Sequence, residues 1–295
     1  MINLEKIKAE KSIKELLEFS IINIDKPTGP TSFGVDVIIK KALNLPKTSH
    51  YGTLDPMVTG VLPVALGRAC KLMPYFIGKK KKYVGIMRMH EEIEIKKIES
   101  EIKNFIGKIT QMPPVKSRVK REFREREIYT FEILEISDNK KDILFETEVQ
   151  AGTYIRKLID DIGKNLGGAH MLELRRTQAS IFKEQDSIDI YQFLEAVKEY
   201  NEGNDKLLRE ILIPGEIISK VIPEIQVKEN SIKKLYHGAP LFSQNLEYQK
   251  DYEKIINEEK IAAFNKDLFI GVFKRVDSKN EELIGTPEYI LQPIK

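Results

Sequence analysis

The order of strand-like and helix-like segments is the feature that most limits what this chain can fold into. Apolar spacing and turn residues predict a strand over 21–24, a helix over 31–43, a strand over 83–89, a helix over 92–106, a hairpin of strands 128–136 and 142–149, and a helix over 154–166. These elements do not follow the regular βαβ rhythm of a parallel sheet. The sequence therefore predicts an α+β fold with a mainly antiparallel mixed sheet flanked by helices.

The two ends of the chain differ from this middle part. Further helices are predicted over 2–19, 190–200 and 207–213, and an acidic helix near 246–259. Pro214-Gly215 closes an acidic stretch, and beyond Ile222-Pro223 the chain is mostly short strands and turns. We therefore expect a helical extension over 1–20, a main domain over 21–215 and a small β-rich domain over 221–295.

Composition excludes several kinds of site. Cys70 is the only cysteine, so a disulfide framework and a cysteine-based zinc site are excluded. The 4 histidines are scattered, which argues against a multi-histidine metal site. Neither a Walker-type loop nor a G-x-G-x-x-G motif is present. No apolar run approaches the roughly 18 residues of a membrane span, and the N-terminus does not read as a signal peptide. The default expectation is a cytoplasmic protein without a metal and without a membrane partner.

The net charge of +3 conceals an uneven distribution. Counted from the sequence, residues 68–183 carry +8, while residues 184–220 carry −5. Most of the arginines lie between Arg68 and Arg176, and arginine is the side chain suited to bidentate phosphate contacts. A basic middle segment is typical of a nucleic-acid-binding protein. A merely solvated surface would give the same count, so charge alone leaves both interpretations open.

The loop over residues 50–63 is the most unusual segment. Asp55 lies between Gly52 and Gly60 and is followed by Pro56, which restricts Asp55 to extended backbone conformations. Such a loop could direct one carboxylate into a cleft. Asp-Pro can also simply open a turn, and the local signals by themselves favour that simpler interpretation.

Several ordered motifs resemble the TruB-type RNA pseudouridine synthases. They are Asp25-Lys26-Pro27-Thr28-Gly29-Pro30, His50-Tyr51-Gly52-Thr53-Leu54-Asp55-Pro56, Lys82-Tyr83-Val84, Gln111-Met112-Pro113-Pro114, Gly152-Thr153-Tyr154-Ile155-Arg156 and Gly168 through Thr177. The last motif is similar to the archaeal and eukaryotic branch, which holds the dyskerin-like catalytic subunit of box H/ACA particles. More weakly, residues 221–295 resemble a PUA domain.

This resemblance implies a pseudouridine-synthase core over 21–215 and a PUA-like RNA-binding domain over 221–295. It implies that Asp55 is the catalytic aspartate and that Arg156 pairs with it. The aspartate could attack the sugar or promote elimination to a glycal, and the sequence does not choose between these routes. The family uses neither a metal nor an organic cofactor. The N-terminal helix is expected to pack on the PUA-like domain, although a partner-binding or surface helix would show the same pattern.

Four further residues are implied to contact the substrate. Tyr83 would lie against the target base, Tyr154 and Leu174 would pack around it, and His50 would fill the space that the flipped base leaves. Without the resemblance, each has a simpler interpretation. Tyr83, Tyr154 and Leu174 read as core residues, His50 as a solvated loop side chain, and Arg156 as a surface or phosphate contact.

The candidates for binding RNA phosphates are basic residues of the middle segment. They are Lys79, Lys80, Lys81, Lys116, Arg118, Lys120 and Arg121. Glutamates at 122, 125 and 127 interleave with this second series, so pairing within the protein is the alternative.

The implied function is conversion of uridine to pseudouridine, either in the TΨC loop of tRNA or in ribosomal RNA under direction of a box H/ACA guide RNA. RNA and the small H/ACA particle proteins are the implied partners. The alternative from another class is a catalytically idle RNA-binding scaffold subunit of such a particle. The presence of Asp55, Tyr83 and Arg156 argues against that alternative.

Overall fold

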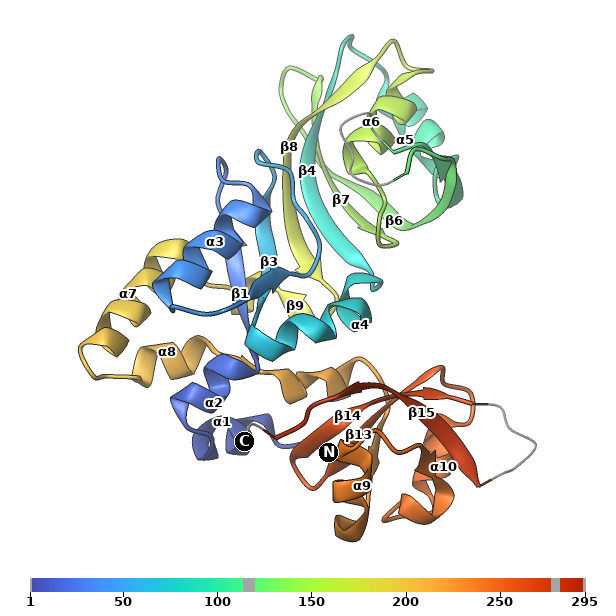
Figure 1. The fold of residues 1–295 in the computed structure, drawn as a ribbon. Coiled ribbons are helices and arrows are strands. Elements are labelled where there is room, and N and C mark those ends of the chain that lie inside the picture. The colour runs from blue at the N-terminus through green and yellow to red at the C-terminus, as the bar shows by residue number, and fades with distance from the viewer. Residues whose placement is uncertain (1, 114–119, 277–281, 294–295) are drawn as a thin grey trace.

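The computed structural model describes residues 2–113, 120–276 and 282–293, and it contains two sheets (Figure 1). The larger sheet has 10 strands in the order β10-β1-β3-β8-β4-β7-β6-β5, with β2 paired to β3 and β9 to β8. Its strands are β1 (Ser20–Lys26), β2 (Thr48–His50), β3 (Thr59–Leu66), β4 (Lys81–Met89), β5 (Gly107–Gln111), β6 (Arg124–Ile136), β7 (Asp142–Val149), β8 (Ala169–Ala179), β9 (Phe182–Lys183) and β10 (Ile213–Pro214).

Most neighbouring strands of this sheet are antiparallel. The parallel pair is β3 with β8, where Thr59 lies opposite Arg175 and Gly60 opposite Arg176. This short pairing joins the part of the sheet around β1 and β3 to the part around β4, β7 and β6. The predicted α+β class with a mainly antiparallel mixed sheet is confirmed.

Helices cover the larger sheet in two places (Figure 1). Near β1 and β3 lie α3 (Ser32–Ala42), α7 (Ile190–Asn201) and α8 (Lys206–Ile211), while α5 (Ile95–Lys103) and α6 (Ile155–Gly163) lie inside the curve of β4, β7 and β6. The Thr31 hydroxyl accepts a hydrogen bond from Gly34 N at 2.9 Å and caps α3, as the sequence predicts. A continuous apolar core fills the space between these helices and the sheet.

The expectation of one helix over residues 2–19 is wrong. Two helices form, α1 (Leu4–Glu10) and α2 (Ile13–Glu18). Ser12 starts the second: its hydroxyl accepts from Glu15 N at 3.3 Å, and the Glu15 carboxylate accepts from Ser12 N at 2.9 Å. This capping box interrupts the helical spacing, because the N-cap residue must be extended.

The local patterns also missed β3, β5 and β8. Seven of the 8 residues of β3 are buried, so the strand shows no alternation of apolar and polar residues. The strand β8 places Glu173, Arg175 and Arg176 close together, which breaks its apolar pattern, and even Arg176 is buried. The acidic helix near 246–259 is shorter than expected and consists of α10 (Asp251–Ile255).

The smaller sheet has 5 strands in the order β11-β13-β14-β15-β12. They are β11 (Glu224–Gln226), β12 (Leu241–Phe242), β13 (Lys260–Asn265), β14 (Leu268–Arg275) and β15 (Leu283–Ile290), accompanied by α9 (Ile232–Tyr236) and α10. The expectation of a C-terminal β-rich domain is confirmed. The domain boundaries and the PUA-like identity stay predictions.

The N-terminal segment packs on the smaller sheet through α1 and Phe19, as the resemblance implied (Figure 1), whereas Leu16 and Leu17 of α2 are buried in the core of the larger sheet. Asn3 N donates to the Asp267 carboxylate at 3.0 Å, and the Phe19 ring stacks on Phe269 with centroids 5.7 Å apart. An apolar cluster contains residues of both sheets and of α1. In the part of the chain that the structure describes, no helix is both long and apolar enough to span a membrane.

Candidate active site and basic pocket

The loop that carries Asp55 is held by a buried lysine. The Lys26 ammonium donates to the carbonyl oxygens of Pro27 at 2.7 Å, Pro30 at 2.9 Å and Pro56 at 3.1 Å. Burial lowers the pKa of Lys26, while the negative charge of Asp55 opposes that shift. Lys26 is fully buried, and its hydrogen bonds to the three carbonyl oxygens offset the free-energy cost of removing its charge from water. The Asp55-Pro56 segment is therefore tied to the 26–30 turn.

A second attachment lies on the other side of Asp55. The Ser32 hydroxyl, in the first turn of α3, donates to Leu54 O at 3.0 Å and accepts from Leu54 N at 2.8 Å. Ser32 is buried, and both backbone groups of Leu54 are satisfied by one hydroxyl. The loop is thus held immediately before and immediately after Asp55.

Asp55 itself stays accessible. Its side chain is 58% exposed, and the Arg156 Nη2 atom lies 3.0 Å from Asp55 Oδ2. Arg156 is in the first turn of α6, and its Nη2 is also 3.1 Å from Met57 Sδ. The structure thus brings together the aspartate and the arginine that the resemblance paired. An accessible carboxylate on a braced loop, oriented by a guanidinium, can act as a nucleophile or a general base.

Arg176 forms the floor beneath this loop. Its side chain is buried, Nε donates to Val61 O at 2.8 Å, and Nη2 donates to Gly52 O at 2.9 Å. It therefore joins the two ends of the loop. Gly60 is required here because it has φ +99° and a Cβ atom would lie 2.2 Å from the Arg176 carbonyl oxygen. Arg176 stands out in the sequence only as part of the motif from Gly168 to Thr177. No local pattern indicates that this arginine will be buried.

Tyr83 is linked to the loop through the same arginine. It lies in β4 opposite Arg176 and is almost fully buried. Burial lowers the pKa of the Arg176 guanidinium, and its hydrogen bond with the Tyr83 hydroxyl opposes that shift. Leu174 is buried two residues earlier in β8, opposite Gly85.

The backbone of Tyr154 is positioned by the side chain of Gln111, which stands out in the sequence only as part of a motif. Tyr154 N donates to Gln111 Oε1 at 3.0 Å, and Gln111 Nε2 donates to Tyr154 O at 3.3 Å. These two hydrogen bonds tie the end of β5 to the start of α6, and Arg156 follows two residues later.

His50 is held against α3. Its Nδ1 lies 2.6 Å from Asp36 Oδ2, and its Nε2 lies 3.0 Å from Thr53 Oγ1. A carboxylate only accepts, so the Nδ1 atom that faces Asp36 carries a proton. The proposed movement of His50 into the space left by a flipped base would require these contacts to break.

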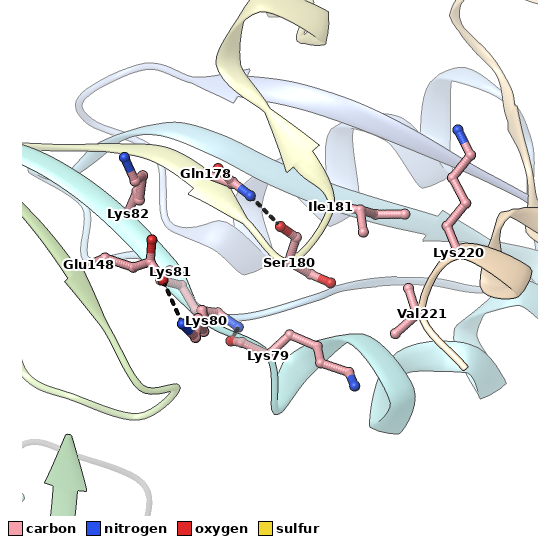
Figure 2. A pocket seen from close by; sticks show the side chains of 10 residues that line it. All are labelled: Lys79, Lys80, Lys81, Lys82, Glu148, Gln178, Ser180, Ile181, Lys220 and Val221. Carbon is pink, nitrogen blue, oxygen red and sulfur yellow. Dashed lines mark hydrogen bonds and ion pairs between the residues drawn. The ribbon is translucent and has the colours of Figure 1, made fainter. Parts of the chain in front are cut away.

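A pocket of about 370 Å³ lies at the start of β4 (Figure 2). It is lined by Lys79, Lys80, Lys81, Lys82, Glu148, Gln178, Ser180, Ile181, Lys220 and Val221. Lys79 and Lys80 are exposed, and the Lys80 ammonium lies 2.9 Å from Glu148 and 3.9 Å from the centroid of the Tyr129 ring.

Lys81 does not fit the expectation that it contacts RNA. Its side chain is only 5% exposed, and its ammonium donates to the carbonyl oxygens of Ile77 and Lys79. Burial, together with the nearby Arg176 charge, lowers the pKa of Lys81 to about 7. The alternation of β4 explains the difference, because Lys81 shares the buried face with Tyr83 while Lys80 and Lys82 do not.

The second predicted basic series is only partly described. Lys120 lies 3.2 Å from Glu122, which also contacts Arg124 at 2.9 Å, so the alternative of pairing within the protein is realised there. Arg121 is exposed. Lys116 and Arg118 lie outside the described residues. Within the described ranges, no three or more His, Cys, Asp or Glu side chains are grouped to hold a metal ion.

Comparison with protein families gives matches over most of this chain. Residues 40–155 match the TruB family pseudouridylate synthase (N-terminal domain), and residues 156–219 match the tRNA pseudouridylate synthase B C-terminal domain. A probable tRNA pseudouridine synthase B of Methanococcus maripaludis strain C6 is 44% identical over 239 residues, which cover 80% of this chain and 71% of the relative. The corresponding protein of Archaeoglobus fulgidus is 41% identical over 261 residues, covering 86% and 77%.

Two solved structures are also similar to this chain over nearly its whole length. The Cbf5 chain in a crystal structure of a Cbf5-Nop10-Gar1 complex superposes with a TM-score of 0.86 at 34% identity, covering 97% of this chain and 89% of that chain. A structure of an H/ACA RNP bound to a substrate RNA containing 2′-deoxyuridine gives a TM-score of 0.84 at 34% identity, with the same coverage.

Proposed function

This chain belongs to the TruB family of pseudouridine synthases, and from that premise we infer that it isomerises uridine to pseudouridine in RNA with Asp55 as the catalytic carboxylate. One observation supports the role of Asp55 most directly. Its carboxylate is exposed and paired with Arg156, while the loop around it is braced by Lys26, Ser32 and Arg176. A fixed loop with an accessible carboxylate is what a reaction at one sugar carbon requires.

The reaction breaks the bond between C1′ and N1 of uracil and forms a bond between C1′ and C5, after which the proton on C5 leaves. Asp55 can attack the sugar to release the uracil, or remove a sugar proton to give a glycal. Arg156 orients the carboxylate in either case. We propose that Tyr83 lies beside the base and that its hydroxyl, held by Arg176, helps remove the C5 proton.

Two kinds of RNA substrate are supported. The matched relatives are named as probable tRNA pseudouridine synthases, which supports tRNA as a substrate. The matched structures contain Cbf5 with Nop10, Gar1 or a substrate RNA, which supports a guide-directed mode with small partner proteins. We propose that the exposed Lys79, Lys80, Lys120 and Arg121 and the C-terminal β-rich domain contribute to RNA binding.

The decisive experiment measures tritium release from 5-tritiated uridine, in a tRNA transcript and in guide-paired ribosomal RNA. Asp55→Asn keeps the size of the side chain and removes its charge, so release should fall below detection while RNA affinity stays within about twofold. Asp160→Asn is a matched control, since Asp160 is 57% exposed and lies 3.0 Å from Lys157. Full tritium release by Asp55→Asn would contradict the proposal. Absence of release by both the wild-type protein and Asp55→Asn would indicate an idle scaffold.

A further inference from the structure

Met57 is an accessible methionine beside the Asp55–Arg156 pair. It is 58% exposed, and its Sδ atom lies 3.1 Å from Arg156 Nη2, the same nitrogen that lies 3.0 Å from Asp55 Oδ2. One guanidinium nitrogen therefore contacts both the sulfur and the carboxylate. The other methionines of the described residues are buried or half-buried. They are Met73, Met87, Met89, Met112 and Met171.

The loop fixes the position of Met57. Val58 N donates to Asp55 O at 3.0 Å, and the Pro56 carbonyl oxygen accepts from the Lys26 ammonium at 3.1 Å. Val58 is also buried. Met57 thus stands between two anchored neighbours, so its sulfur keeps its place beside the guanidinium for as long as the loop keeps its shape.

Oxidation of this sulfur would change what it offers to the guanidinium. A thioether is a weak hydrogen-bond acceptor, whereas the oxygen of a sulfoxide is polar and accepts much more strongly. At 3.1 Å there is no room for an oxygen between Met57 Sδ and Arg156 Nη2. The oxidised side chain must therefore displace the guanidinium or take its N–H groups from the side. Either arrangement draws Arg156 away from Asp55.

We propose that Met57 is a modification site, at which oxidation by a hydroperoxide to the sulfoxide lowers activity by disrupting the Asp55–Arg156 pair. The sulfur lone pair attacks one oxygen of hydrogen peroxide, so an S–O bond forms as the O–O bond breaks. The proton on the transferred oxygen passes to the departing hydroxide, which leaves as water. The sulfur loses two electrons, and the peroxide gains them. Met57 is a positioning residue for Arg156, and the proposal rests on the proposed function.

Cys70 is the single thiol of the chain, and its surroundings protect it from the same oxidant. It is buried, and burial raises the pKa of its thiol to about 11. The thiolate is the form that reacts with peroxide, so Cys70 reacts slowly at neutral pH. A loss of activity on mild oxidation is therefore expected to come from Met57.

The test treats the full chain with hydrogen peroxide, stops the reaction with catalase, and maps the oxidised residues by peptide mass spectrometry. Met57 should gain one oxygen before the other described methionines do. In step with that gain, kcat for tritium release from tRNA should fall about fivefold or more, while KM stays within about twofold and the midpoint temperature of unfolding is unchanged. Methionine sulfoxide reductase with dithiothreitol should restore kcat, and dithiothreitol alone should not.

Three variants separate Met57 from other oxidisable residues. Met57→Leu removes the sulfur and keeps the size of the side chain, so peroxide should leave its kcat within about twofold of its own untreated value. Met171→Leu, at a half-buried position in β8, is the matched control and should stay as sensitive to peroxide as the wild-type protein. Met57→Gln places a carbonyl acceptor beside Arg156 and should lower kcat without peroxide.

Equal peroxide sensitivity of Met57→Leu and the wild-type protein would overturn the proposal. Full activity of protein in which Met57 is oxidised would overturn it as well, and so would oxidation of a buried methionine before Met57. Failure of the proposed function is distinguishable from these outcomes, because it would appear as absence of tritium release by the untreated wild-type protein. The order of methionine oxidation is measured by mass and does not depend on activity.

Discussion

Arg176 and Lys81 are buried basic side chains close to the loop that carries Asp55. Arg176 has carbonyl partners at Gly52 and Val61 and the Tyr83 hydroxyl, so its charge is compensated by hydrogen bonds. Lys81 has two carbonyl partners, which match the two N–H groups of a neutral amine. Because Arg176 lies nearby, a second positive charge at Lys81 is disfavoured.

Lys81 should therefore make stability depend on pH. Its pKa is about 7 in the folded protein and near its ordinary value of 10.5 in the unfolded chain, so between these values the unfolded state binds more protons and stability rises with pH. Relative to Lys81→Met, the wild-type protein should gain up to about 1.4 kcal/mol per pH unit from pH 7 to 10. Urea unfolding at several pH values measures this difference. Parallel curves for the two proteins would show that Lys81 keeps its charge when folded.

At the scale of elements, the candidate site depends on contacts between segments far apart in the sequence. The loop between β2 and β3 is held by the start of α3, by the end of β1 and by β8. Gly60 lets β3 pair closely with β8 at the parallel junction of the sheet. The loop's conformation is thus set mainly by its neighbours.

Ser32→Ala should loosen this loop without altering the chemistry of Asp55. It leaves the N–H and C=O of Leu54 unpaired in a buried place, which costs roughly 1–3 kcal/mol. We expect kcat for tritium release to fall at least several-fold while RNA affinity changes little.

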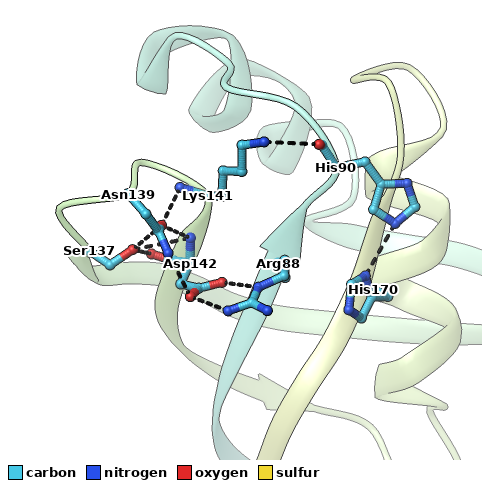
Figure 3. A network of polar contacts seen from close by, with 7 residues as sticks. All are labelled: Arg88, His90, Ser137, Asn139, Lys141, Asp142 and His170. Carbon is cyan, nitrogen blue, oxygen red and sulfur yellow. Dashed lines mark hydrogen bonds and ion pairs between the residues drawn. The ribbon is translucent and has the colours of Figure 1, made fainter.

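Ser137→Ala is the control for this prediction. The Ser137 hydroxyl also bridges both backbone groups of one residue, donating to Asp142 O at 2.9 Å and accepting from Asp142 N at 3.2 Å, in the turn between β6 and β7 (Figure 3). Asp142 N also donates to Asn139 Oδ1 at 3.0 Å, and Asp142 O also accepts from Ser137 N at 2.9 Å, so the loss of this hydroxyl should cost less stability than the loss of the Ser32 hydroxyl. That turn also contains Asn139 and lies beside the Arg88–Asp142 ion pair. Among the described residues, this polar cluster makes no hydrogen bond to the loop of Asp55. Equal losses of kcat in both variants would contradict a specific role for Ser32.

At the scale of the whole molecule, the two sheets share one apolar cluster. Phe19 from the N-terminal part stacks on Phe269 of β14, and Phe269 also lies 5.1 Å from Phe264 between ring centroids. Tyr51, in the loop of Asp55, belongs to the same cluster and donates through its hydroxyl to Ala69 O at 2.7 Å. The loop of Asp55 is therefore connected to the smaller sheet through one continuous apolar cluster.

We expect the chain to unfold in one cooperative transition because of this shared cluster. Phe269→Ala removes its central ring, should cost about 3–5 kcal/mol, and should separate the transition into two. Phe193→Ala is the control, since Phe193 is equally buried but lies in the apolar core between the larger sheet and its helices. This variant should lower the midpoint temperature of unfolding without splitting the transition. Scanning calorimetry distinguishes these results, and two resolved transitions in the wild-type protein would refute the expectation.

Motif order and local spacing were enough to predict the α+β class, the family and the pairing of Asp55 with Arg156. The predicted hairpin also forms, as β6 and β7. These features are local, or they are carried by residue types that tolerate few alternatives, such as the glycines and prolines around Asp55. The roles of Asp55, His50, Tyr83, Tyr154, Arg156 and Leu174 in the reaction stay predictions.

Tertiary structure decided the features that depend on the surroundings of a residue. Whether Arg176 can be buried at all depends on carbonyl oxygens of Gly52 and Val61, which lie 124 and 115 residues away in the sequence. The carbonyl partners of Lys81 are its sequence neighbours Ile77 and Lys79, but the nearby Arg176 charge that lowers its pKa comes from β8. The strand β8, which contains Glu173, Arg175 and Arg176, and the mostly buried β3 form because each pairs with strands distant in the sequence. Lys220 joins the basic pocket only because the chain returns to β4 there. Residue types and spacing determined which groups the chain carries, but the free energy of burying a charge is set by the three-dimensional environment, which no local pattern contains.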